Sequence, residues 1–382
     1  MRSSAGKLRS LHKLSTVARL TVVMKSLVIA LQVLLAIGCT SPRQDIPPPL
    51  PEAACENPPT AQSSRIQGEV TPGLDGDARE RAALLNPDRI TVVTCGTGSP
   101  VPSDRAQSCA AVFVGGQMLV FDVGDGAQPS MERLNLPVQD VSAVFITHFH
   151  SDHIADLGEL ISRSWILGRT TELPVIGPEG IDRVVSGFNQ VYVADEAHRI
   201  AHHGEAIMRP GVLAAIARRF SDPGPDGAVV FDQGGVVVKA FRVDHTPIQP
   251  AVGYRIEHRG RVVSISGDTV DTPAFRTLAT GADILVAEVM DKHFTLDMSC
   301  ALGRAGSERS SIIFRDIYDY HTDTLELAQL SAAAGVKTLM LTHQVPSLPS
   351  SQAQGYFSGP IQRYFSGELV VSEDGSRRTL DL

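Results

Sequence analysis

The chain of 382 residues lacks several features by which common classes of protein are recognised. Its five cysteines form no Cys-x-x-Cys pair, which argues against a cysteine-ligated zinc module. The glycine-rich stretch "CGTGSP" at Cys95 has no lysine, so it is not a phosphate-binding P-loop. An apolar run at residues 27–37 is shorter than the roughly 20 apolar residues that a transmembrane helix needs. With 43% hydrophobic and 20% charged residues, the chain is globular and can bury a sizeable core.

Acidic residues are absent from the first 38 positions, which carry only basic charge. The formal net charge is −8, so the rest of the chain is more acidic than this total suggests. An acidic body repels phosphate backbones at long range. We therefore expect that a long nucleic acid is not the partner.

The basic N-terminal segment has the pattern of an export signal. From Met24 it reads "MKSLVIALQVLLAIGCTS", with a lysine, an apolar run and small residues before a cysteine. Cys39 after "AIG" resembles the lipobox of bacterial lipoproteins. We predict a signal peptide over residues 1–38, with Met24 as a candidate true start, and lipidation of Cys39. An ordinary signal peptide or an uncleaved anchor is the alternative, and membrane fractionation of Cys39→Ala distinguishes them.

The chain then divides into a tether and a folded domain. Residues 39–87 are rich in proline and poor in large apolar residues, which predicts an extended tether. The folded domain is expected over residues 88–382. Four cysteines besides Cys39 allow three disulfide connectivities, and buried free thiols are an equal alternative. They are Cys55, Cys95, Cys109 and Cys300.

Short β-rich runs alternate with helical stretches from Asp88 onward. Strands are predicted at 89–96, 109–116, 117–124, 141–147, 235–244, 251–268 (as a pair), 283–290 and 336–343. Helices are predicted at 156–168, 179–200, 272–281 and 322–335, and a hairpin around Asp-Gly at 367–382. Two β-rich halves with helices outside predict an α/β fold with four layers, an αβ/βα sandwich.

Ionisable residues concentrate where predicted strands end. The stretch "THFHSDHIADL", from Thr147 to Leu157, directly follows the apolar run "VSAVFI". His148 and His150 lie two apart, so in an extended segment both side chains point the same way and can bind one ion. Asp152 and His153 follow at a turn into a helix. Imidazole nitrogen with carboxylate oxygen suits zinc and tolerates manganese or iron.

These motifs resemble those of the metallo-β-lactamase superfamily, in its ribonuclease Z and arylsulfatase-like branch. The resemblance covers roughly Ile90 to the C-terminus. Its motifs are "FDVGDGAQ" at 121–128, "THFHSDH" at 147–153, "DHTPIQPAVGYRI" at 244–256, "SGDT" at 266–269 and "YHTDTLELAQLSAAAGVKTLMLTH" at 320–343. Their order along the chain makes the resemblance specific, and it implies the four-layer metallo-β-lactamase sandwich.

The resemblance also implies a set of site residues. One metal would be held by His148, His150, His245 and Asp268, and the other by Asp152, His153, His343 and the same Asp268. Two zinc ions are expected, with manganese or iron as alternatives, and a hydroxide between them as the nucleophile.

Three further residues match functional positions of the family. Asp122 would orient a ligand histidine, or else cap a turn. His321 would protonate the leaving oxygen, or else merely precede a helix. Glu288 would support His321, or else be an ordinary core or surface glutamate. Asp152 and His321 are the predicted catalytic residues.

The reaction expected from these features is hydrolysis of a phosphodiester or aryl sulfate ester of a small molecule. The alternatives are a ribonuclease Z-like endonuclease, a lactonase or other acyl hydrolase, and a non-catalytic metal-binding surface lipoprotein. The predicted location is the periplasm or a membrane, reached through a lipid on Cys39. The predicted partner is a small-molecule ester, and a homodimer is left open.

Overall fold

The computed structural model describes residues 78–101 and 103–382. The predicted signal peptide, the Met24 start and the lipidated Cys39 lie outside these residues. In the described residues, no helix is long and apolar enough to cross a membrane.

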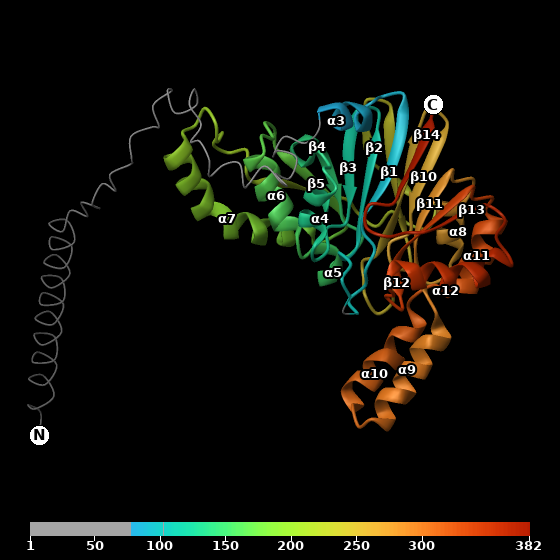
Figure 1. The fold of residues 1–382 in the computed structure, drawn as a ribbon. Coiled ribbons are helices and arrows are strands. Elements are labelled where there is room, and N and C mark those ends of the chain that lie inside the picture. The colour runs from blue at the N-terminus through green and yellow to red at the C-terminus, as the bar shows by residue number, and fades with distance from the viewer. Residues whose placement is uncertain (1–77, 102) are drawn as a thin grey trace, which may run out of the picture. The chain divides into compact units, whose positions relative to one another are not determined.

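Two seven-stranded mixed sheets form the centre of the domain (Figure 1). The first sheet runs, in spatial order, β14 (Arg377–Asp381), β1 (Arg89–Gly96), β2 (Cys109–Val114), β3 (Gln117–Phe121), β4 (Val141–Phe145), β5 (Leu173–Gly177) and β6 (Ala215–Arg219). The second runs β13 (Glu368–Val371), β12 (Thr338–Val345), β11 (Ile284–Met290), β10 (Arg261–Ile265), β9 (Val252–His258), β8 (Val236–Arg242) and β7 (Ala228–Gln233). In each sheet one half is antiparallel and the other parallel.

Helices cover the outer faces of both sheets. Those that follow strands of the first sheet are α4 (Ala127–Arg133), α5 (Ser151–Ile154), α6 (Leu157–Ile166) and α7 (Ile181–His203). Those that cover the second sheet are α8 (Pro273–Ala279), α11 (Thr324–Ala333) and α12 (Ser350–Gln362). The second half also contains α9 (Lys292–Arg304) and α10 (Glu308–Asp316), which lie away from the sheet (Figure 1). Short 3-10 turns lie at Val138–Asp140 and Ile317–Asp319.

Three apolar clusters separate the four layers. The central cluster joins residues of both sheets, with Phe121 stacked on Phe145 at 4.8 Å and Tyr254 of β9 packed against both. The buried Tyr254 hydroxyl donates to the Ile146 carbonyl at 2.6 Å, which ties the second sheet to the end of β4. The outer clusters lie between each sheet and its helices. The predicted αβ/βα sandwich is therefore confirmed.

The C-terminal segment does not form the predicted hairpin. β13 pairs with β12 in the second sheet, whereas β14 pairs antiparallel with β1 in the first. The Asp-Gly turn therefore carries the chain from one sheet to the other. Asp374 holds this turn against the first sheet by accepting from the backbone N–H and hydroxyl of Thr97.

A helix begins inside the range predicted as tether. α3 (Ala78–Leu84) places Leu84 in the first outer cluster, and Arg81 forms an ion pair with Asp140 at 2.5 Å. A disulfide joins Cys95 to Cys109 across β1 and β2, while Cys300 on α9 is a free thiol. Sequence could not choose this pairing among the connectivities.

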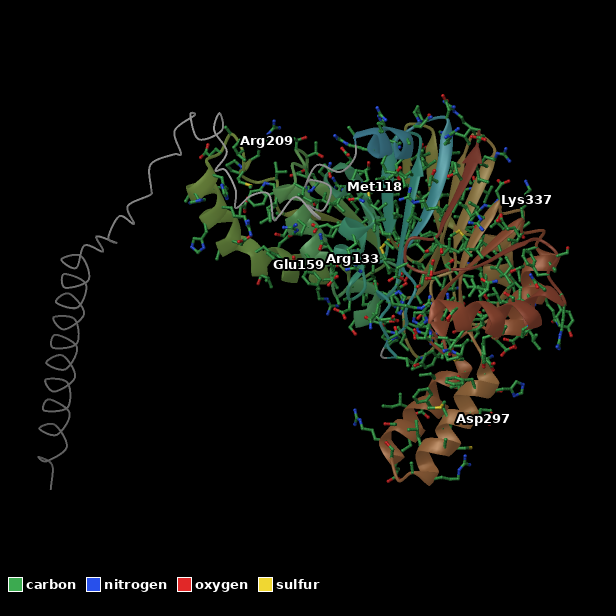
Figure 2. All side chains as sticks on the ribbon, viewed as in Figure 1. Met118, Arg133, Glu159, Arg209, Asp297 and Lys337 are labelled. Carbon is green, nitrogen blue, oxygen red and sulfur yellow. A yellow bond between two sulfur atoms is a disulfide. The ribbon has the colours of Figure 1, made fainter. Side chains whose placement is uncertain are left out.

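Helices α9 and α10 form a hairpin outside the four layers (Figure 1), where Figure 2 labels Asp297. The two helices are joined by reciprocal bonds in which Ser299 and Ser311 each donate a hydroxyl to the other's carbonyl, at 2.8 and 2.7 Å. The hairpin is inserted between the end of β11 and the segment before α11. It is absent from the elements predicted from the sequence.

Candidate metal centre

Residues from four segments distant in the sequence meet at one end of the two sheets. His148 and His150 follow β4, Asp152 and His153 lie in α5, His245 follows β8, Asp268 follows β10, and His343 lies in β12. All of them are buried except His150, which is half-buried. The structure thus brings together every predicted metal ligand.

These side chains form two groups that share one member. The first group contains His148, His150, His245 and Asp268, and the second contains Asp152, His153, Asp268 and His343. Within each group the potential ligand atoms lie within 4.8 Å of one another. The composition of both groups is the one that the family resemblance implies.

Asp268 connects the two groups through a single oxygen. Its Oδ2 atom lies 3.3 Å from Nε2 of His153 and 3.4 Å from Nε2 of His343 in the second group. The same atom lies 3.8 Å from Nε2 of His148 and 3.9 Å from Nε2 of His245 in the first group. One carboxylate therefore faces imidazoles of both groups.

The chemistry of the donors fits two transition metals. Nε2 of His153 and Nε2 of His245 are buried without a hydrogen-bond partner among the described residues. Burying a polar atom without a hydrogen-bond partner costs about 1–3 kcal/mol of folding free energy. Each such atom therefore calls for an explanation, such as a bound ion. Neutral imidazole and carboxylate are ligands of zinc-type ions, and these orphaned nitrogens face the shared carboxylate. The centre therefore suits a pair of ions, of unidentified metal.

The outer ring nitrogens of the ligand histidines are held by fixed partners. Nδ1 of His153 lies 2.8 Å from Oδ2 of Asp122, and Nδ1 of His245 lies 2.9 Å from the Tyr320 carbonyl. Asp122 also accepts from the N–H and the hydroxyl of Thr147, both at 2.8 Å. Such partners fix which nitrogen is free to bind a metal. The roles of Thr147 and Tyr320 were not predicted, and a backbone acceptor such as Tyr320 has no sequence signal.

His343 reaches the centre from a β-bulge rather than from beyond a strand end. β12 continues to Val345, but its pairing with β11 passes from Thr342 to Gln344 and leaves His343 unpaired. His343 has φ 44°, a left-handed conformation that is uncommon for a residue with a side chain. A bulge re-aims one side chain at a functional site, which here is Nε2 of His343 at 3.1 Å from Asp152.

The two groups differ in the pKa values of their histidines. Burial lowers the pKa of His148 well below its ordinary value and that of His245 to about 4. Burial alone would also lower the pKa values of His153 and His343, but the effect of the nearby carboxylates outweighs it. Led by Asp268, they raise the pKa of His153 well above its ordinary value and that of His343 to about 9.

We expect metal binding to the second group to release protons from its histidines, whereas the histidines of the first group have none to release. A histidine must lose its proton to bind a metal. In the metal-free protein at pH 7, His153 and His343 are protonated, because their pKa values are raised. Protons therefore compete with zinc for the imidazole nitrogens of the second group below about pH 9, and the zinc affinity of this group falls as pH falls. His148 and His245 are already neutral at pH 7.

Calorimetric zinc titrations at pH 7 in buffers of different ionisation enthalpy measure the number of protons released. The expected result is about two more protons released with one zinc equivalent than with the other, because a proton lost from metal-bound water adds to the histidine protons. Proton release shared equally by the two equivalents would contradict the assignment.

His321 and Glu288 form a buried pair beside the second group. Nδ1 of His321 lies 2.5 Å from Oε2 of Glu288, whose Oε1 accepts from the Thr269 N–H. Burial lowers the pKa of His321 to about 3. Burial, together with the charge of Asp268, raises the pKa of Glu288 well above its ordinary value. Near neutral pH the imidazole of His321 is therefore neutral, and Glu288 holds its proton more firmly than an ordinary carboxyl group.

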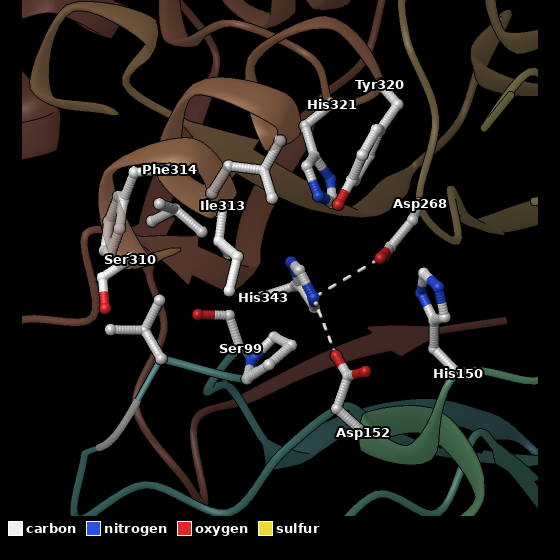
Figure 3. A pocket seen from close by; sticks show the side chains of 14 residues that line it. Ser99, His150, Asp152, Asp268, Ser310, Ile313, Phe314, Tyr320, His321 and His343 are labelled. Atoms are coloured by element: carbon white, nitrogen blue, oxygen red, sulfur yellow. Dashed lines mark hydrogen bonds and ion pairs between the residues drawn. The ribbon is translucent and has the colours of Figure 1, made fainter. Parts of the chain in front are cut away.

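A cavity of about 290 Å³ opens beside these groups (Figure 3). Residues of the metal centre line one side, with His321 and Tyr320 next to them. The opposite side is lined by residues of α10, including Ile313 and Phe314. A substrate in the cavity can therefore reach the metal ligands and His321 together.

The remaining histidines of the described residues do not join the metal groups. His198, His202 and His203 are in α7, and His293 is in α9. His258 is buried, with its Nδ1 atom 2.8 Å from the Gly235 carbonyl. None of them belongs to a ligand group among the described residues.

Comparison with known proteins identifies the family. A model described as "Beta-lactamase superfamily domain" matches residues 119–344. Ribonuclease Z of Mycolicibacterium paratuberculosis is 34% identical over 296 residues, which cover 76% of this chain and 99% of that protein. Ribonuclease Z of Mycobacterium marinum is 34% identical over 289 residues, which cover 75% of this chain and 96% of that protein.

Solved structures share the fold. A metallo-beta-lactamase fold protein of Bacillus subtilis matches with a TM-score of 0.56 and 18% identity, over 77% of this chain and all of that one. Human tRNase Z, short form, matches with a TM-score of 0.53 and 21% identity, over 75% of this chain and 98% of that one. The chain thus belongs to the beta-lactamase superfamily, in its ribonuclease Z branch, and its centre is that of a metallo-hydrolase.

The expectation that excluded a long nucleic acid is wrong. The relatives that match over nearly their whole length are ribonucleases by name. Net charge misled because salt screens charges beyond about 8–10 Å, so the field at a site depends on local groups. Two divalent ions would themselves outweigh the carboxylates of Asp152 and Asp268. Neither mycobacterial relative supports the arylsulfatase part of the prediction, since both are ribonucleases by name.

Proposed function

We propose that this chain is a two-metal phosphodiesterase that cleaves RNA. The observation that carries the proposal is the position of Asp268, whose Oδ2 atom faces both groups of histidines. A carboxylate shared between two ions is the arrangement suited to in-line displacement at phosphorus. The similarity to ribonuclease Z along nearly the whole length of those relatives supports RNA as the substrate.

The metals would be held by the seven ligands named above. When bound, they would polarise the phosphate oxygens and lower the pKa of water, which makes a nucleophile near neutral pH. Asp152 lines the cavity, and the nearby histidines outweigh its burial and lower its pKa. It therefore stays ionised and can accept a hydrogen bond from the attacking water.

His321 is placed to help the leaving oxygen. Its Nδ1 atom is engaged by Glu288, so its other nitrogen is the one that can serve the cavity. As the phosphorus–oxygen bond breaks, that nitrogen gives its proton to the leaving oxygen. When Glu288 is protonated, its carboxyl group can pass that proton to Nδ1, which leaves a neutral imidazole and a carboxylate.

We expect metal-replete protein to cleave a transfer RNA transcript that carries single-stranded extensions at both ends. A chelator should abolish cleavage, and zinc or manganese should restore it, because the nucleophile depends on the metals. Gel electrophoresis of end-labelled transcript measures the rate and maps the cleaved bond. Asp268→Asn, purified in parallel, controls for contaminating nucleases.

A panel of other esters separates the proposal from its alternatives. The panel contains an aryl phosphodiester, an aryl sulfate and a lactone, each assayed on the same metal-replete preparation. Efficient lactone or sulfate hydrolysis without RNA cleavage would refute the proposal and favour the other ester hydrolases.

A further inference from the structure

The cavity beside the metal centre has an apolar wall that the proposed chemistry does not use. Its residues on this side are Pro100, Val101, Ile313, Phe314, Ile317 and Val345. Among the described residues that line this wall none is charged, and Ser99 and Ser310 add hydroxyls beside it. The wall therefore suits a flat, largely apolar group rather than a phosphate.

The α9–α10 hairpin supplies one exposed part of this wall, and Pro100 supplies another. α10 has no buried residue, and its residue Ile313 is 47% exposed where it lines the cavity. Ile312, its neighbour on the same helix, is 39% exposed but does not line the cavity. An exposed apolar side chain that faces a catalytic cavity is a candidate for contact with substrate.

His321 fixes which part of an RNA would lie against this wall. His321, Tyr320 and the α10 residues line the same cavity, as Figure 3 shows. If His321 serves the leaving oxygen, the nucleoside attached to that oxygen lies beside His321. The wall of α10 is then within reach of its base.

We propose that the apolar wall of Ile313 and Phe314 binds the nucleobase of the leaving nucleoside, an inference that rests on the proposed function. Every base has a face that can stack on an aromatic ring, so such a wall favours RNA without reading its sequence. The cavity volume of about 290 Å³ is at the lower end for ligand pockets. It fits one unpaired base better than a base pair, so the leaving nucleoside should be single-stranded.

The test uses the transfer RNA transcript after its cleaved bond has been mapped. Analysis of the new ends identifies the leaving nucleoside, which is the one that keeps the hydroxyl. Two further RNAs are then assembled, one abasic at the leaving nucleoside and one abasic at the nucleoside across the bond. For the parent enzyme, kcat/KM should fall about 5- to 150-fold with the first RNA, and less with the second.

Variants of α10 connect this loss to the wall. Ile313→Ala and Phe314→Ala should lower kcat/KM for intact RNA, and they should have little further effect on RNA that is abasic at the leaving nucleoside. Ile312→Ala is the matched control and should behave as the parent. Phe314→Leu keeps most of the side-chain volume, and unchanged metal content shows that each variant is folded.

Each outcome supports or overturns a defined statement. If RNA cleavage does not depend on the abasic position, or if kcat/KM falls equally in Ile312→Ala and Ile313→Ala, the wall does not bind the nucleobase. The proposed function is unaffected by that outcome. Absence of RNA cleavage by the metal-replete parent overturns the proposed function, and with it the proposal that the wall binds a nucleobase.

Discussion

Asp268→Asn is expected to lower the metal content from about two ions per chain to one or fewer and to abolish most RNA cleavage. The change keeps the shape of the side chain but removes the charge that faces imidazoles of both groups. Loss of an outer carboxylate typically costs about 10–100-fold in metal affinity or activity. Because Asp268 faces two sites directly, we expect a combined loss of about 10²–10⁴-fold or more. Elemental analysis and the end-labelled transcript measure both effects.

Asp122→Asn provides a graded comparison on the same centre. Asp122 contacts His153 of the second group directly, and it reaches His148 of the first group only through the Thr147 hydroxyl, which lies 3.1 Å from Nδ1 of His148. Its loss should therefore weaken the second site by about 10–100-fold and the first site less. Asp297→Asn, on the outer hairpin, controls for a general effect of removing a carboxylate. Two retained ions and near-parental cleavage in Asp268→Asn would rule out the shared-ligand assignment.

The metal ligands could be predicted from sequence because they follow apolar runs with strand periodicity. "VFIT" before His148 and "VVSISG" before Asp268 mark where buried strands end, and polar residues there must meet at one edge of a sheet. Sequence could not show that His343 occupies a bulge inside β12, because a bulge depends on the register with β11. Nor could it reveal the Tyr320 carbonyl beside His245, since every residue carries a carbonyl.

The errors of prediction arose where local pattern competes with tertiary pairing. Residues 367–382 read as a hairpin because Asp-Gly favours a tight turn, yet their two strands pair with β12 and β1 in different sheets. The α9–α10 hairpin was not predicted from the sequence. α10 buries no side chain, because its apolar residues Ile313 and Phe314 line the cavity instead of packing against a sheet. That same lack of burial leaves Ile313 exposed at the cavity.

The leaving-group role of His321 leads to a second large effect. His321→Ala should retain both metals and lose about 10²–10⁴-fold in RNA cleavage, because general acid catalysis typically contributes this much. His321 also lies close enough to Asp268 and His343 to form a third group of potential ligands with Glu288. Metal content therefore has to be measured for this variant, and a loss of metal would assign His321 to the centre itself.

A series of phosphodiesters with different leaving groups separates proton donation from simple positioning. A nitrophenolate departs readily without a proton, whereas the alkoxide of a nucleoside does not, so the deficit of His321→Ala should widen as the pKa of the leaving group rises. Glu288→Gln should show the same trend with a smaller deficit. Glutamine can occupy the position beside Nδ1 of His321 but cannot supply a proton to that nitrogen. His343→Ala should instead lose metal and activity toward all esters alike. Equal deficits for nitrophenolate and alkoxide in metal-replete His321→Ala would eliminate the proton-donor role, since a residue that only positions the phosphate affects both leaving groups equally.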